Sequence, residues 1–109
     1  MDIRELTEEM DRFVSAKGWY QPNTLRPQTP RNLAISLSLE SSEILEHFQW
    51  REEATDKQGL SEELADVALY LLQLAKVSGI DLEQAIMYKL QKNYSRTWDT
   101  EIEKEKGLE

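Results

Sequence analysis

The sequence predicts an all-α protein, and three observations lead to that class. Runs that alternate apolar and polar residues are short, so few segments have the period of two expected of a strand. Apolar residues instead recur at the three- and four-residue spacing of a helix in four separate segments. Aspartates followed three residues later by Glu or Gln, at Asp2 with Glu5 and at Asp81 with Gln84, are typical of helix N-termini. We therefore expect a protomer of the four-helix-bundle type.

A proline-containing loop is expected to separate the first two helices. Helical spacing of apolar residues predicts the first helix over 3–17, and Gly18 supplies its C-terminal signal. All three prolines fall in WYQPNTLRPQTPRN. Because proline lacks the N–H that a helix interior needs, this stretch is expected to be a loop. The second helix is expected over about 31–52.

A polar connector precedes the second pair of helices. REEATDKQG has no apolar periodicity and is expected to lead into a third helix over 60–78. The capping-box pair that starts at Asp81 opens a fourth helix, which is expected to continue to about Trp98. Seven of the last eleven positions are charged. The predicted organisation is therefore one helical domain over 1–98 and a charged C-terminal tail over 99–109 that frays.

Composition excludes several functional classes. Cysteine is absent and there is one histidine among 109 residues, so any metal must be held by oxygen atoms. The formal net charge of −8 argues against nucleic-acid binding, which depends on neutralising phosphates, so a phosphate-bearing ligand needs a mediating cation. No apolar run has the length of a membrane span, and no signal-peptide pattern is present. We expect a cytoplasmic protein that binds neither nucleic acid nor a membrane.

Two pairs of acidic residues, each three positions apart, are the main chemical signal. Glu40 and Glu43 fall in a polar strip between apolar stripes of the second helix. Glu63 and Asp66 lie on the third helix, which is apolar on nearly every side. One such pair is ordinarily a solvated face, but neither pair here has Lys or Arg three or four residues further on as an ion-pair partner. Because unpaired carboxylates are disfavoured in apolar surroundings, we predict a site for Mg²⁺ or Mn²⁺.

The fourth helix carries polar groups that a polyphosphate ligand needs. Helical projection places Lys89, Asn93 and Arg96 within or beside the apolar arc that contains Ile86 and Leu90. Lys and Arg are the usual phosphate partners, and Asn offers both a donor and an acceptor to a base edge or sugar hydroxyl. For Lys89 the alternatives are snorkelling towards solvent and an ion pair with the acids. The three residues together indicate a nucleotide-binding set.

The acidic pattern also matches a known family. Glu40-x-x-Glu43 followed by Glu63-x-x-Asp66 resembles the motif of the MazG-type all-α nucleoside triphosphate pyrophosphohydrolases. PRNLAISLSLESSEILEHFQW, EELADVALYLLQLA and KLQKNYSR are similar to the dCTP pyrophosphatase subgroup, and the similarity covers nearly the whole chain. The resemblance implies Mg²⁺-dependent hydrolysis of a (deoxy)nucleoside triphosphate such as dCTP to the monophosphate and pyrophosphate. It also implies a house-cleaning role in nucleotide pools.

The resemblance assigns roles to individual residues. It implies that Mg²⁺ is held by Glu40, Glu43, Glu63 and Asp66, and that the protein is a homotetramer built as a dimer of dimers. Proton transfer from the attacking water then falls to one of the two acids of the second helix, Glu40 or Glu43. The residues implied to form the nucleotide pocket are Trp19, Trp50, Tyr70, Lys89, Asn93 and Arg96.

Departures from the subgroup fall on base recognition. WYQPNTLRPQTPRN is longer than the corresponding connection in close relatives, and Gln28 lies where they carry a histidine. Met10 corresponds to a first-helix histidine of some members. Base choice depends on hydrogen bonds from such positions. Hydrolysis of dUTP, a modified nucleotide or another triphosphate on the same scaffold therefore stays open, as does a non-catalytic helical interaction module.

Overall fold

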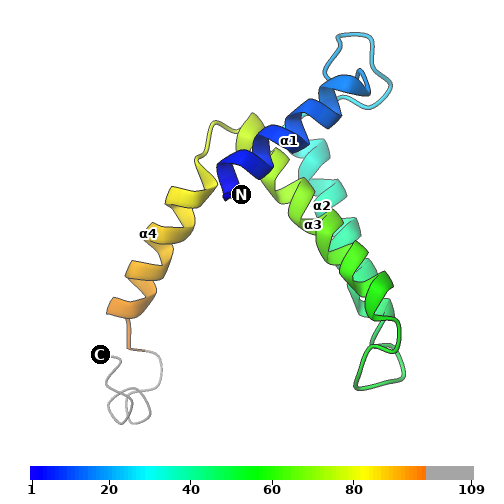
Figure 1. Ribbon diagram of the computed structural model, residues 1–109, viewed down its shortest axis with the longest axis vertical. Coiled ribbons are helices and arrows are strands. Elements are labelled where there is room, and N and C mark those ends of the chain that lie inside the picture. The colour runs from blue at the N-terminus through cyan, green and yellow to red at the C-terminus, as the bar shows by residue number, and fades with distance from the viewer. Residues whose placement is uncertain (98–109) are drawn as a thin grey trace.

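The computed structural model describes residues 1–97, and its regular structure there is entirely helical (Figure 1). The helices are α1 (Ile3–Ala16), α2 (Pro30–Glu46), α3 (Lys57–Val77) and α4 (Leu82–Ser95). The predicted all-α class and the four helices are confirmed for this part of the chain. None of these helices is both long and apolar enough to cross a membrane. The tail predicted over 99–109 lies outside the described residues.

Side-chain caps fix the start of every helix. Asp2, Thr29, Asp56 and Asp81 each accept a hydrogen bond from the backbone N–H three residues further on. Each bond satisfies a donor that the first helical turn leaves without an intrahelical partner. Proline suits the first position of α2 because its fixed φ is already helical. The predicted starts at Asp2 and Asp81 are confirmed, whereas α3 begins three residues earlier than predicted because Asp56 caps it.

The end of α2 differs from the prediction. The helix ends at Glu46, and the N–H groups of His47 and Phe48 bond to carbonyls three residues back, which tightens the last turn. Trp50 then has a φ of 69°, in the left-handed region. A right-handed helix cannot continue through such a residue, so the predicted extension over 47–52 is wrong.

α3 is the central helix of the fold. It packs along α2 and against α1, whereas α1 and α2 do not contact each other. Met10 and Val14 of α1 form the core with Leu72 of α3, and Leu33 of α2 is only 2% exposed. α3 was expected to be buried on nearly every side, but side chains such as Leu64 stay exposed. Within one chain only α1 and α2 are available to cover it along its length.

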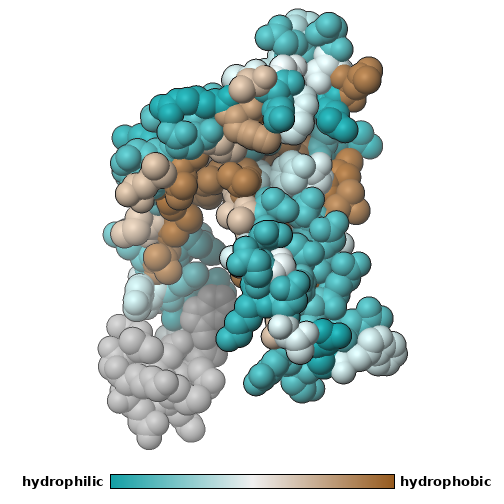
Figure 2. All heavy atoms as spheres, turned by 45° about the vertical axis from the view of Figure 1, so that its right-hand side comes forward, coloured by the Kyte–Doolittle hydropathy of each residue, from teal (hydrophilic) through white to brown (hydrophobic). Residues whose placement is uncertain are grey.

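α4 diverges from the other helices instead of packing along them (Figure 1). It meets α1 and α3 at its N-terminal end, has no contact with α2, and contains no buried residue. Apolar side chains are consequently exposed along it, as the brown surface in Figure 2 shows. Ile86 and Leu90, two residues of the predicted apolar arc of this helix, are therefore exposed in a single chain, whereas Leu82 at its start packs against the core. The large exposed hydrophobic residues of α4 and the preceding turn are Ile80, Ile86, Met87, Tyr88, Leu90 and Tyr94.

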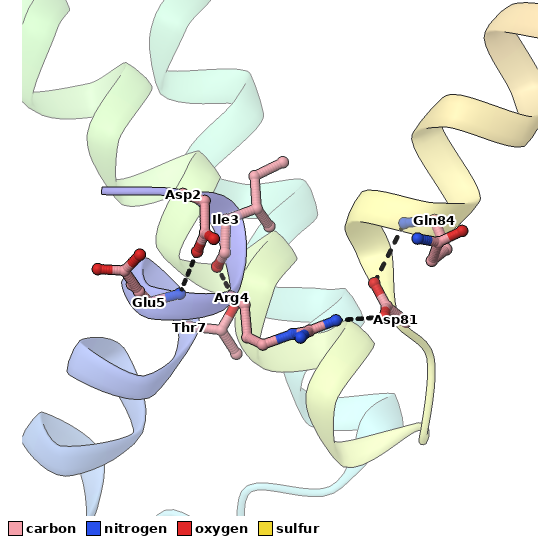
Figure 3. Close-up of polar contacts among 7 residues, drawn as sticks. All are labelled: Asp2, Ile3, Arg4, Glu5, Thr7, Asp81 and Gln84. Carbon is pink, nitrogen blue, oxygen red and sulfur yellow. Dashed lines mark hydrogen bonds and ion pairs between the residues drawn. The ribbon is translucent and has the colours of Figure 1, made fainter.

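The start of α4 is attached to α1 by one acidic residue. Asp81 accepts a hydrogen bond from the Gln84 N–H through Oδ1, and its Oδ2 lies 3.4 Å from Nη2 of Arg4 (Figure 3). Gly79, just before it, has a φ of 70°, a conformation that ends α3 and redirects the chain. α4 then ends at Ser95 because Arg96 is extended, so the predicted continuation to Trp98 is too long.

Candidate metal and nucleotide site

The packing of α2 on α3 brings the two acid pairs together. Glu40 is half-buried, and its Oε2 atom is buried with no hydrogen-bond partner. Burial raises the pKa of the Glu40 carboxyl, and the negative charges of Glu43, Asp66 and Glu63 raise it further. The charges of all three acids act on the Glu40 carboxyl, where Glu40 and Glu63 are half-buried and Glu43 and Asp66 are exposed.

Glu63 has a close neighbour that sequence reasoning did not assign to the site. His47 follows α2, and its Nε2 atom lies 2.7 Å from Oε2 of Glu63, with both side chains mostly buried. The two atoms are at ion-pair distance but are not aligned as a hydrogen bond, so this oxygen lacks a hydrogen-bond partner. A Cβ at Gly59 would lie 3.2 Å from Cε1 of His47, so glycine leaves room for the ring. The available signal was that His47 shares the polar strip of the α2 acids.

The donor chemistry of this group fits a hard divalent cation. All four side chains are carboxylates, and two of their oxygens, from Glu40 and Glu63, are buried without hydrogen bonds. Mg²⁺ prefers oxygen ligands at about 2.0 to 2.1 Å in near-octahedral geometry. As they stand, no three acidic or histidine side chains in residues 1–97 are grouped closely enough to hold an ion. The residue types fit a metal, but the side chains must converge to bind it.

Trp19 and Tyr70 line two cavities, and one of these includes an acid of the predicted site. The first has a volume of about 360 Å³, lies between α1 and α3, and includes Asp66 in its wall. The second has a volume of about 510 Å³ and lies beneath the proline-containing loop. Its polar lining residues are Arg26, Gln28, Asn32 and Ser36. Aromatic walls beside a carboxylate group give this region the dimensions and chemistry of a small-molecule site.

Trp19 is held in place by two neighbouring groups. Its ring meets that of Phe13 edge to face at a centroid distance of 5.6 Å. The guanidinium carbon of Arg26 lies 5.8 Å from the ring centroid, which is the range of a cation–π contact. The indole therefore has a defined position between the core and the loop.

The other predicted site residues line neither of these cavities. Trp50 is 94% exposed in the turn after α2. Lys89 is exposed on α4, and Asn93 is half-buried there with an Oδ1 atom that has no hydrogen-bond partner. Arg96 follows the last residue of α4. Helical projection misplaced Trp50 and Arg96 because both helices end before reaching them.

Paired acids on adjacent helices, beside an aromatic cavity, define an all-α protein with a carboxylate site. The model of the MazG-like family matches residues 35–109, and the chain belongs to this family. The family resemblance predicted from the sequence is thereby confirmed. The structure is also similar to the crystal structure of a pyrophosphatase from Archaeoglobus fulgidus. The TM-score is 0.70, with 37% identity, and the match covers 83% of this chain and 86% of that one.

Similar sequences support the assignment to this family. dCTP pyrophosphatase 1 of Rattus norvegicus is 35% identical over 104 residues, and that of Homo sapiens is 34% identical over the same length. Each alignment covers 87% of this chain and 56% of the relative. The chain thus spans little more than half the length of these relatives.

Proposed function

We propose that the chain is a Mg²⁺-dependent nucleoside triphosphate pyrophosphohydrolase that converts a substrate such as dCTP to the monophosphate and pyrophosphate. The observation that carries the proposal is the buried Oε2 of Glu40, which has no hydrogen bond and is subject to the negative charges of Glu43, Asp66 and Glu63. Such oxygens are costly unless neutralised, and a divalent cation would neutralise them. Membership of the MazG-like family and the similarity to dCTP pyrophosphatases support the reaction class and the choice of dCTP.

Glu40, Glu43, Glu63 and Asp66 are the residues that would hold Mg²⁺, and Mn²⁺ suits the same donors. When bound, the metal supplies charge neutralisation and orientation for the triphosphate oxygens. Glu40 or Glu43 accepts the proton of the attacking water, because both belong to the polar strip of α2.

In this proposal the base of the nucleotide occupies the region around Trp19 and Tyr70. Its triphosphate extends towards the four carboxylates. Support comes from Asp66, which lines the same cavity as both aromatic rings. Stacking of a base on an aromatic side chain is worth roughly 1 to 3 kcal/mol without regard to base identity. Trp19 and Tyr70 therefore supply affinity, while discrimination between bases must come from polar groups of the cavity wall.

A second copy of the chain covers the exposed apolar side of α4, so the active form is a dimer or tetramer. α4 has no contact with α2, where Glu40 and Glu43 lie, so Lys89 and Asn93 meet an acidic site only through assembly or movement of α4. Exposed Ile86 and Leu90 supply the apolar surface that an interface requires. Sedimentation velocity should show an oligomer at micromolar concentration. A monomer would exclude this part of the proposal.

Activity and metal binding test the function together. The chain is incubated with dCTP, dUTP, dTTP, dATP and dGTP, with Mg²⁺ or with EDTA, and pyrophosphate is measured. Calorimetric titration of Mg²⁺ without nucleotide gives a second readout. Glu43→Gln and Asp66→Asn should weaken Mg²⁺ binding and abolish turnover, whereas Glu46→Gln, an exposed position on the same helix as Glu43, should change neither. Unchanged Mg²⁺ affinity in both acid variants would remove these residues from the site.

The same panel decides between the open alternatives. Turnover of dUTP or another triphosphate in preference to dCTP would keep the proposed reaction and change the proposed substrate. Gln28 is a reason to test this, because the dCTP pyrophosphatase subgroup has histidine at the corresponding position. Absence of turnover together with absence of Mg²⁺ binding would favour a helical interaction module.

A further inference from the structure

Gln73 is the only buried polar side chain within residues 1–97, with 4% of its surface exposed. It lies on α3, close to one helical turn beyond Tyr70, and lines the cavity between α1 and α3. Its Nε2 atom donates a hydrogen bond of 2.7 Å to Oε1 of Gln28, which lines the other cavity. This bond joins α3 to the proline-containing loop across 45 positions of the sequence.

The direction of this bond is determined by a third group. Nε2 of Gln28 donates to the backbone carbonyl of Arg26 at 2.6 Å. A carbonyl oxygen can only accept, so the nitrogen end of Gln28 must face Arg26 and the oxygen end must face Gln73. Gln73 must therefore present an N–H, and a residue that only accepts could not replace it.

The amide pair acts on the part of the loop that holds Trp19. Gln28 fixes the backbone of Arg26, and the Arg26 guanidinium lies over the Trp19 ring. Trp19 itself lines both cavities. A loss of the Gln73 bond would leave a polar atom of Gln28 unpaired and free the segment that bears Arg26.

The start of the same loop is also held against α1 and α3, at Tyr20. Asp11 of α1 accepts from Nζ of Lys76 on α3 at 2.9 Å. Burial and the neighbouring Asp11 carboxylate raise the pKa of the Tyr20 phenol to about 12. Asp11 and Gln73 are both hydrogen-bonding neighbours of the Tyr20 phenol, so Gln73 acts on the beginning of the loop at Tyr20 and on its end at Gln28.

We propose that Gln73 is a positioning residue for base selection, which acts through Gln28 to hold Arg26 and Trp19 at the boundary between the two cavities. This inference rests on the proposed function, because it concerns the part of the site that contacts the base. In the proposed function the base contacts the aromatic rings of Trp19 and Tyr70. Gln73 contributes by fixing the loop that forms one of the cavity walls.

A matched pair of substitutions tests the direction of the bond. Gln73→Glu removes the donor and sets an acceptor against Gln28 Oε1. Gln28→Glu keeps an acceptor for the Gln73 N–H but removes the donor to the Arg26 carbonyl, so it breaks the second bond of the series. Gln73→Met removes the donor at similar volume, in case a buried carboxylate prevents folding. Gln58→Glu, at an exposed position of the same helix, is the control for added charge.

Kinetics with dCTP and dUTP separate positioning from a general structural effect. Gln73→Glu and Gln73→Met should raise KM for the preferred nucleotide about tenfold, the factor expected for one lost hydrogen bond. Their kcat should stay within about threefold of the parent, and the ratio of kcat/KM between the two bases should fall. Gln28→Glu should raise KM at least as much, because it removes the bond that holds the Arg26 carbonyl. The proposal would be overturned if folded Gln73→Met had the KM of the parent and the same ratio of kcat/KM between the two bases. It would also be overturned if the only effect were an equal fall in kcat for both nucleotides.

Hydrogen exchange without nucleotide gives a readout that does not depend on activity. The amides of Thr24 and Arg26 are hydrogen-bonded within the loop, so their exchange reports its order. Both should exchange faster in Gln73→Met and stay at the parental rate in Gln58→Glu. If the parent hydrolyses no triphosphate, the proposed function fails, and loop exchange still decides the attachment. Unchanged exchange in Gln73→Met would refute it.

Discussion

Replacing Glu40 with Gln should stabilise the protein when no metal is present. The Glu40 carboxyl has one buried oxygen without a hydrogen bond and lies among three other acids. Glutamine keeps the size of the side chain and removes its charge. The substitution therefore removes the repulsion while leaving the packing of α2 on α3 nearly unchanged.

The expected gain is about 1 kcal/mol at neutral pH, the low end of the range for an unsatisfied buried group, because Glu40 is only half-buried. A change of this size moves Tm by roughly 4 to 8 °C in a domain of this length. The sign depends on pH. The pKa of Glu40 is raised above its ordinary 4.5, so the folded state holds this proton more tightly than the unfolded chain. The protonated Glu40 carboxyl therefore contributes stability that is fully present below pH 4.5 and is lost as pH rises through the folded-state pKa.

The assay is thermal unfolding in EDTA at pH 4 and at pH 7.5. Glu40→Gln should melt with the parent at pH 4, where Glu40 is protonated in the folded state, and above the parent at pH 7.5. Glu46→Gln, at an exposed position of the same helix, is the matched control and should show no such difference. Mg²⁺ should stabilise the parent more than Glu40→Gln, since only ligands of the native state raise its Tm. A Tm of Glu40→Gln below that of the parent at pH 7.5 would mean that the carboxylate is a structural partner.

Three further predictions follow from separate parts of the fold. His47→Ala should lower stability without metal by about 1 kcal/mol, because Glu63 loses its close neighbour; an unchanged Tm would show that the contact is unimportant. Gly79→Ala should lower the free energy of unfolding, measured in urea, by roughly 1 to 2 kcal/mol, because a residue with a Cβ is strained in the left-handed region. No neighbouring atom would clash with the added Cβ, so equal stability would contradict the positive φ. Alkaline unfolding should show stability falling between pH 10 and about 12 in the parent and less so in Tyr20→Phe, because the raised pKa of Tyr20 makes the folded state retain its proton; identical profiles would refute this.

Local signals account for what the sequence predicted correctly. Helix starts at Asp2 and Asp81 depend on a side chain and a backbone N–H three residues apart, so the sequence contains the whole interaction. The acid pairs were identifiable because three-residue spacing places both members on one side of a helix, and their role as metal ligands stays a prediction. His47 could have been included, because helical projection puts it in the same strip.

Non-local packing accounts for what the sequence did not predict. The direction of α4 depends on a left-handed Gly79 and on where Asp81 meets Arg4, a residue 77 positions away. Trp50 was placed on a helix because the apolar periodicity of the sequence continues to this residue. In the structure α2 ends earlier, at Glu46. The Gln73 contact with Gln28 joins segments that no local pattern connects.

Product analysis of one reaction tests the central claim most directly. dCTP is incubated with the chain and Mg²⁺ while phosphorus NMR follows the products, and a parallel sample contains EDTA in place of the metal. A pyrophosphohydrolase that uses the carboxylate site should give dCMP and pyrophosphate in equal amounts, and none of either in EDTA. Formation of dCDP and inorganic phosphate, or equal turnover in EDTA, would contradict the account.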